Sequence, residues 1–171
     1  MLVVVGDTHR TEDHGLTGRT REAARSAEVL AHTGDFTTEA VYEVFRAIPD
    51  RFYAVSGNND EMALQRRLPT RTDFSAEGLT VALVHGHERS AQGLSLLGRE
   101  VDADIVASGH SHRPSVEITD ELTLLNPGSH AAPRQYQPAH AELERAPDGV
   151  NGRVVRPDGT VIEAFSIDRT E

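Results

Sequence analysis

Short apolar runs rich in β-branched residues recur along the first two thirds of the chain. These runs are Leu2–Val5, Val29–Ala31, Phe52–Val55, Leu79–Val84 and Asp104–Ala107. Runs of this length and composition predict β-strands, because branched and aromatic side chains pack well on a pleated surface. No run approaches the roughly 20 apolar residues of a membrane-spanning helix, so the sequence predicts no membrane partner.

Helical patterning fills the segments between these runs. Thr20–Leu30 places alanines and a leucine on one face, and Thr38–Ile48 carries apolar residues close to the i, i+3, i+4, i+7 spacing. The threonine that opens the second segment suits a helix N-cap. Glu61–Leu68 and Ala91–Glu100 carry weaker helical patterns. Strand and helix therefore alternate to about residue 110, which predicts an α/β layered fold.

Strand signals dominate the remainder of the chain. Three strand pairs are predicted, with turns at Glu77-Gly78, Asp120-Glu121 and Pro157-Asp158-Gly159. We expect the C-terminal third to form a second sheet packed on the first, and Ser129–Pro138, rich in Ala, Pro and Gln, to be a loop. Because no repeat or linker is visible, we expect one domain over residues 1–171.

Composition narrows the chemistry. The 171 residues include no Cys and no Lys, and 17 arginines face 27 Asp and Glu for a net charge of −10. Without Cys there is no disulfide, thiolate nucleophile or thiolate metal site. Without Lys there is no P-loop lysine, kinase lysine or Schiff base. Nine histidines remain, so we expect histidine and carboxylate chemistry.

The charge also bears on habitat and partners. An acidic, Lys-free composition resembles that of proteins from extreme halophiles, and the alternative is a GC-rich genome that writes Arg in place of Lys. The negative charge makes a nucleic-acid partner unexpected, although molar salt would weaken that argument. Met1–Val5 lacks the basic region of a signal peptide, so we expect a cytoplasmic protein.

Five of the apolar runs end in short polar stretches of Gly, Asp, Asn and His. In chain order these read GDTH at 6–9, GD at 34–35, GNND at 57–60, HGH at 85–87 and GHSH at 109–112. In open α/β sheets, ligands bind in the crevice at the carboxyl ends of the strands. Each stretch alone is common, but five at strand ends predict one shared site.

The donor types in these stretches point to a metal. The seven candidate ligands are Asp7, His9, Asp35, Asn58, His85, His110 and His112. Carboxylate, amide and imidazole donors without thiolate suit ions such as Mn, Fe, Co or Zn. Seven ligands are too many for one tetrahedral site and suit two ions bridged by a carboxylate. Because paired ions clamp the oxygens of an in-line displacement at phosphorus, the residues predict a binuclear metallohydrolase acting on a phosphoester.

The order of these motifs resembles that of the calcineurin-like metallophosphoesterase superfamily, and at this length its small phosphodiesterase branch from archaea and bacteria. Asn126-Pro127-Gly128-Ser129 also resembles a loop of that branch. The resemblance implies an α/β fold of the metallo-dependent phosphatase type, a two-sheet β-sandwich flanked by helices in four layers.

The resemblance also implies a site. In it, Asp7, His9 and His112 hold one metal, Asn58, His85 and His110 hold the other, and Asp35 bridges them. A metal-bridging hydroxide then attacks phosphorus in line, while Asn58 steadies the phosphoryl oxygens. The expected cofactors are two divalent ions, with Mn first and Ni, Co, Zn or Fe as alternatives.

One position departs from the wider superfamily, where a histidine that serves as general acid often follows the metal-binding Asn. Here that place is Asn59, whose neutral amide cannot protonate a leaving alkoxide. His87 is the nearest substitute by sequence, and Asp60 is left to cap the following helix. We therefore expect catalytic roles for Asn58, His87 and Asp60, and phosphate contacts from Asn58, Asn59 and Arg113.

Three functions stay open on this evidence. The first is a phosphodiesterase for a small phosphoester. The second is a protein-interaction scaffold, because the small subunit of the eukaryotic retromer resembles this branch and has lost ligand histidines. The third is a phosphomonoesterase acting on a small phosphorylated metabolite. The full ligand set favours an enzyme, and members of the branch are often homo-oligomers.

Overall fold

The structure is a computed structural model that describes residues 1–119 and 121–168. A six-stranded sheet has the order β11-β10-β9-β1-β2-β3. Its strands are β1 (Leu2–Val5), β2 (Val29–His32), β3 (Arg51–Ala54), β9 (His140–Ala146), β10 (Gly149–Val155) and β11 (Val161–Asp168). β1, β2 and β3 run parallel, and the three C-terminal strands pair antiparallel.

A five-stranded sheet has the order β4-β5-β6-β8-β7. Its strands are β4 (Arg71–Ala76), β5 (Leu79–Val84), β6 (Ile105–Ala107), β7 (Ser115–Ile118) and β8 (Thr123–Asn126). β5, β6 and β8 are parallel, and β4 and β7 close the two edges in the antiparallel sense. The parallel strands of both sheets carry their motifs at their carboxyl ends.

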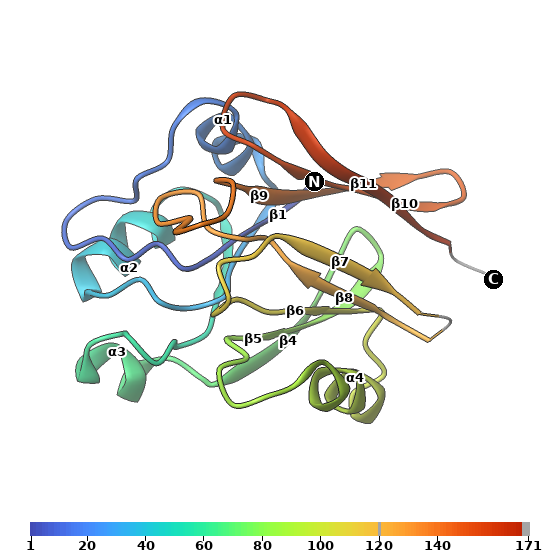
Figure 1. The fold of residues 1–171 in the computed structure, drawn as a ribbon, viewed down its shortest axis with the longest axis horizontal. Helices are drawn as coiled ribbons and strands as arrows, with labels where there is room; N and C mark the ends of the chain where they lie inside the picture. Colours follow the sequence, from blue (N-terminus) through green and yellow to red (C-terminus); the bar gives the residue numbers. More distant parts are fainter. Residues whose placement is uncertain (120, 169–171) are drawn as a thin grey trace.

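The two sheets pack face to face with helices outside them (Figure 1). Leu2 and Val4 of β1 join the core between the sheets, whereas Val3 and Val5 face the helices. α1 (Gly18–Ser26) and α2 (Glu39–Arg46) cover the six-stranded sheet, and α4 (Ala91–Glu100) covers the five-stranded sheet. This burial on both faces explains why β1 is a continuous apolar run. The expected four-layer α/β sandwich is confirmed.

The predicted helices are present, with shifted ends for α1, α2 and α3 (Met62–Arg67) and with the predicted ends for α4. The Thr38 side chain accepts a hydrogen bond from Val41 N, so it caps α2 as expected. The helix predicted to reach Leu30 instead ends at Ser26, because the chain turns extended at Ala27 and the next residues form β2. α3 is short and buries Leu64.

The placement of the C-terminal third differs from the prediction. β9, β10 and β11 extend the first sheet, and β4 to β8 build the second. The reason is that β1 has a free edge opposite β2, where Leu2 pairs with Leu143 of β9. β9 itself was not predicted, because buried His140 and Glu142 alternate with small or apolar residues and mask its strand character.

The remaining sequence predictions concern loops and membranes. The segment 129–138 lies outside helix and strand, as predicted. Asp120 of the predicted second turn lies outside the described residues. In the described ranges, no helix is both long and apolar enough to cross a membrane.

Candidate metal centre

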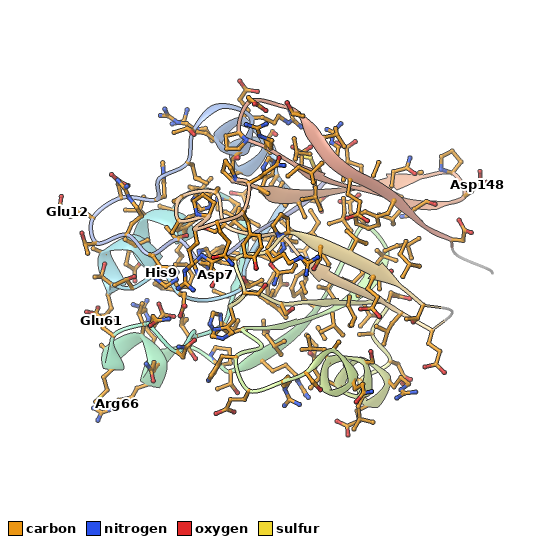
Figure 2. All side chains as sticks on the ribbon, in the orientation of Figure 1. Asp7, His9, Glu12, Glu61, Arg66 and Asp148 are labelled. Carbon is orange, nitrogen blue, oxygen red and sulfur yellow. The ribbon has the colours of Figure 1, made fainter. Side chains whose placement is uncertain are left out.

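The five motif stretches meet where β1, β2, β3, β5 and β6 end. Figure 2 shows Asp7 and His9 at the end of the sandwich close to α2 and α3, whereas Asp148, in the turn between β9 and β10, lies at the opposite end. The strand ends of both sheets therefore supply one site, as in other layered α/β proteins.

One group of candidate ligands joins Asp7, His9 and His112, whose ligand atoms all lie within 4.8 Å of one another. His9 Nε2 lies 3.2 Å from His112 Nε2, and the two rings are stacked. The His112 Nδ1 donates to the Ala132 carbonyl oxygen, which leaves the Nε2 lone pair directed at the site. A hydrogen bond of this kind sets the tautomer and orientation of a ligating histidine.

A second group joins Asp7, Asp35 and His85 within the same limit of 4.8 Å. Asp35 Oδ2 lies 3.3 Å from His9 Nε2 and 3.4 Å from His85 Nε2. The His85 Nδ1 donates to the Thr33 carbonyl oxygen at 2.8 Å, so Nε2 faces the carboxylate. One oxygen of Asp35 therefore stands between a histidine of each group.

Asn58 brings His110 to the second group. Its Oδ1 lies 2.9 Å from His85 Nε2 and 3.2 Å from His110 Nδ1. The backbone N–H of His110 donates to Asp7 Oδ1 at 3.1 Å. All seven candidate ligands of the sequence are thus gathered in one continuous cluster.

The surroundings of the Asp7 carboxylate indicate that the cluster can hold a cation. This residue is fully buried, and its Oδ2 has no hydrogen-bond partner among the described residues. Burial, assisted by the charge of Asp35, raises the pKa of Asp7 to about 7, although nearby histidines and the His110 amide oppose the rise. A buried carboxylate oxygen without a donor is costly, and a divalent cation beside it would stabilise the ionised form.

Asp35 is held in the ionised form. Burial by itself raises the pKa of Asp35, but hydrogen bonds from His85, His9 and Asn59 outweigh it and hold the pKa well below its usual range. Burial lowers the pKa of His110 and of His112. Burial acts in the same direction at His85, but Asp35 outweighs it and raises the pKa of that imidazole. Neutral imidazoles and an ionised carboxylate are the forms that bind metals.

Backbone strain gathers at the same place. Among the described residues, nine other than glycine have positive φ, and five of them are candidate ligands: Asp7 (49°), His9 (47°), Asp35 (60°), His110 (68°) and His112 (59°). Such conformations are uncommon for these residue types and persist where the surrounding structure enforces them, often at functional sites. The turns that end the strands therefore direct the ligands.

The structure changes the roles expected for Asn59 and Asp60. The Asn59 Nδ2 donates to Asp35 Oδ2, a partner that the sequence did not predict, and its expected contact with a phosphate stays a prediction. Asp60 accepts from the backbone N–H groups of Gly57, Asp35 and Thr37. Its predicted cap on α3 is wrong, because the N-cap is Glu61 and its side chain makes no capping bond. Asp60 instead ties the loop after β2 to the loop after β3.

His87 and Arg113 lie at the edge of the cluster. The His87 ring is partly exposed, with its centroid 5.4 Å from that of His85 and 6.0 Å from that of His110. Arg113 is exposed and lines a cavity that also borders His110. Neither side chain hydrogen-bonds a candidate ligand among the described residues, so both are available to a bound molecule.

His32 is a site residue that sequence reasoning missed. It is fully buried and stacks on Phe36 with ring centroids 3.6 Å apart. Its Nδ1 accepts from Gly34 N at 3.1 Å, so its Nε2 donates to Thr8 Oγ1 at 2.8 Å. The ring thereby links the Asp7–His9 loop to the loop of Asp35. The only sequence signal was a polar residue inside a buried strand.

The Asn126–Ser129 stretch has a similar linking role. The Asn126 Nδ2 donates to the Gly109 carbonyl oxygen at 2.8 Å, and the Ser129 hydroxyl donates to the Asp7 carbonyl oxygen at 2.7 Å. Ser129 Oγ also accepts from Ala132 N at 2.8 Å, next to the carbonyl that holds His112. This stretch therefore supports candidate ligands of both sheets through hydrogen bonds.

Comparison with known proteins identifies the family of this arrangement. The model of the calcineurin-like phosphoesterase superfamily domain matches residues 1–145. The chain belongs to this superfamily. It is 27% identical over 173 residues to a probable metallophosphoesterase of Methanothermobacter thermautotrophicus, with 99% of both chains covered.

Other proteins are also similar to this chain. Vacuolar protein sorting-associated protein 29 of Schizosaccharomyces pombe is 25% identical, with 75% of this chain and 71% of that protein covered. YfcE, a phosphoesterase from E. coli, shares the fold at a TM-score of 0.74 and 24% identity, covering 98% and 99% of the two chains. Vps29 from Entamoeba histolytica complexed with Zn²⁺ shares it at a TM-score of 0.78 and 22% identity, covering 98% and 99%.

Proposed function

We propose that the protein is a phosphodiesterase that works with two divalent metal ions. The observation that carries the proposal is the position of Asp35 Oδ2, 3.3 Å from His9 Nε2 and 3.4 Å from His85 Nε2. A carboxylate oxygen between histidines of two ligand groups suits a bridge between two ions. Family membership and the donor set support divalent metal binding.

In this proposal each ion has three ligands of its own besides Asp35. Asp7, His9 and His112 would hold one ion, and Asn58, His85 and His110 would hold the other. Manganese is the proposed ion, because the donors are oxygen and imidazole. Paired divalent ions supply a nucleophile at neutral pH and Lewis acidity toward the phosphoryl oxygens.

The side chains of the chain itself orient the substrate. Asn58 presents its amide beside His85 and His110, where it contacts a phosphoryl oxygen. Arg113 donates to the phosphate from the neighbouring cavity as a charge-assisted partner. His87, partly exposed and beside the same two histidines, is the proposed proton donor to the leaving group. Asn59 and Asp60 are positioning residues.

The test is hydrolysis of bis(p-nitrophenyl) phosphate by the manganese-loaded protein. We expect turnover that is lost in Asp35→Ala and in His110→Ala, with Glu144→Ala as an exposed control that retains it. His87→Asn is expected to slow hydrolysis by about 10²–10⁴-fold if His87 is the acid, and less for diesters with better leaving groups. No turnover with Mn, Co, Ni or Zn, in low or molar salt, would overturn the proposal.

A scaffold function is the second candidate. The similarity to the S. pombe sorting protein supports it, as does the fold shared with Chaetomium thermophilum Vps29 complexed with a cyclic peptide. The seven-membered donor cluster favours the enzyme. Purified protein that binds no metal and forms a stable complex with a partner would favour the scaffold, and faster hydrolysis of a mononucleotide than of any diester would favour a phosphomonoesterase.

The proposal treats residues 1–171 as one domain. The family match ends at residue 145, but β10 and β11 continue the sheet that carries Asp7 and Asp35. Limited proteolysis is expected to leave the C-terminal strands attached to the rest of the chain. A stable fragment ending near residue 145 would contradict this assignment.

A further inference from the structure

Two cavities flank the segment His85–Arg89, which follows β5. One, of about 340 Å³, borders Asn58 and His85, and the other, of about 620 Å³, borders His110. The rings of His85 and His110 are 5.4 Å apart between centroids. Both cavities therefore open beside the same part of the candidate metal centre, and their volumes match those of small-molecule sites.

The larger cavity has a lining of mixed polarity with one apolar side, and we call it the apolar cavity after that side. Leu94 of α4, Val116 of β7 and Leu124 of β8 line it. Leu94 and Val116 are only half-buried, so they present apolar surface to the space. Covering this surface is favourable at roughly 25 cal/mol per Å², so the cavity suits an apolar group of a bound molecule.

The smaller cavity is lined by polar side chains, and we call it the polar cavity. Gln65 of α3 and Thr70 and Arg71 at the start of β4 line it together with Arg89. In the described part of the chain, the one ion pair of Arg71 is with the exposed Asp73 at 3.3 Å, and an exposed pair has little strength. The polar cavity therefore offers amide, hydroxyl and guanidinium groups to an anionic or strongly polar group, with the exposed carboxylate of Glu88 at its border.

Two arginines border these spaces without a carboxylate partner. Arg89 lines both cavities and Arg113 lines the apolar cavity, and neither forms an ion pair in residues 1–119 and 121–168. Arg99 of α4, by contrast, lies 3.2 Å from Glu121. Unpaired guanidinium groups beside a metal centre suit the oxygens of a phosphate.

We infer that the substrate is an asymmetric phosphodiester. Its aromatic or short aliphatic arm enters the apolar cavity, its anionic or strongly polar arm enters the polar cavity, and Arg89 contacts the phosphate between them. The inference rests on the proposed function, because it places the phosphate at the candidate metal centre. It assigns Leu94 and Val116 to one arm and Arg71 to the other.

The first test compares three phosphonates as competitive inhibitors of bis(p-nitrophenyl) phosphate hydrolysis. Phenylphosphonate is expected to bind about tenfold more tightly than methylphosphonate, because a ring fills the apolar cavity. Leu94→Ser and Val116→Thr remove this preference, whereas Leu96→Ser, on the exposed side of the same helix, retains it. 3-Phosphonopropionate probes the polar cavity. Arg71→Gln is expected to weaken the binding of this compound about tenfold, whereas Arg66→Gln, at an exposed position of α3, leaves its binding unchanged.

The second test needs no activity. Methyl NMR spectra of zinc-loaded protein are recorded during titration with phenylphosphonate and with methylphosphonate. Larger shifts of the Leu94 and Val116 methyl groups with the phenyl compound support the inference. Equal affinities for the two phosphonates, or equal effects of Leu94→Ser and Leu96→Ser, overturn it.

The two tests separate the inference from the proposed function. Hydrolysis of diesters without any preference among the phosphonates overturns the two-cavity inference and leaves the phosphodiesterase intact. Phenyl-specific methyl shifts without hydrolysis of any diester overturn the phosphodiesterase and leave the apolar cavity as a ligand site. If the protein shows neither hydrolysis of a diester nor phenyl-specific methyl shifts, both the inference and the proposed function are overturned.

Discussion

Asn59 holds the Asp35 carboxylate through two hydrogen bonds of 2.8 Å, from its side-chain Nδ2 to Oδ2 and from its backbone N to Oδ1. The same Oδ2 faces His9 and His85. The residue that stands where many superfamily members carry a histidine therefore orients the carboxylate between the two ligand groups. Its amide acts on the candidate metal centre through Asp35.

Asn59→Ala is expected to weaken metal binding by about 10–100-fold, as loss of a hydrogen bond to a metal ligand typically does. The backbone bond to Oδ1 remains, so the loss is partial. Competition with a chromogenic chelator measures it. Asn151→Ala, on the exposed side of β10, is the control, and equal affinities for the two variants would contradict the role of Asn59.

Gly57→Ala is expected to displace Asp35. A Cβ at Gly57 would lie 2.1 Å from Asp35 Oδ1 and 2.4 Å from Asp35 N, and the backbone atom cannot move without shifting the loop after β2. We expect loss of metal binding and lower stability in urea unfolding. Gly93→Ala in α4 meets nothing closer than 3.7 Å and is expected to stabilise by up to about 1 kcal/mol. Unchanged metal affinity in Gly57→Ala would show that the loop adapts.

Glu142 anchors α1 and β10 to β9 at a distance from the metal centre. Its buried carboxylate accepts from Arg19 at 2.7 Å, from Arg153 at 2.6 Å and from His140 at 2.8 Å. Glu142→Gln is expected to cost about 3–5 kcal/mol of unfolding free energy, because it breaks a buried ion-pair network. Glu144→Gln, exposed on the same strand, is expected to change it by less than about 0.5 kcal/mol. Urea denaturation of both variants measures the difference.

His130 is expected to make stability depend on pH. Burial lowers its pKa from 6.5 to about 4, and its Nε2 donates to the His14 carbonyl oxygen. Below pH 6.5 His130 becomes protonated in the unfolded chain but stays neutral in the folded chain. Its contribution to the unfolding free energy is therefore complete above that pH and is lost as the pH falls. The loss by pH 5 is about 2 kcal/mol.

The variant His130→Gln separates this effect from other groups, because the amide can still donate to His14. Unfolding free energies of the metal-free protein at pH 7.5 and at pH 5 are compared with those of the variant. Between these two pH values, we expect the unfolding free energy of the variant to fall by about 2 kcal/mol less than that of the unsubstituted protein. Parallel losses in both proteins would show that His130 does not carry the dependence.

Local patterns predicted much of the fold. Leu2–Val5 and Leu79–Val84 were placed to the residue, because continuous apolar runs carry their own signal. The weaker helical pattern of Ala91–Glu100 also matched its helix to the residue. Local patterns could not predict which of the two sheets each strand would join. β9 pairs with β1 across most of the chain, and no local pattern states which free edge a strand will join.

The same division holds for the candidate site. Five polar stretches at strand ends predicted that seven candidate donors would lie together, because parallel strands bring their carboxyl ends to one edge. The superfamily came from the resemblance of their order. The supporting residues were not predictable. His32 and Ser129 act through hydrogen bonds to Thr8 and to the Asp7 carbonyl oxygen, and such contacts exist only once distant loops are adjacent.

By itself, the sequence determined the chemistry that this protein has available. It contains oxygen and imidazole donors at strand ends and neither thiolate nor lysine, and these are properties of residue type and spacing. The tertiary structure decided how each donor is used. It set Asp35 between His9 and His85, placed the Asn59 amide on Asp35, and formed two cavities on either side of His85–Arg89. Orientation and cavity shape depend on packing between segments far apart in the chain, which no local pattern encodes.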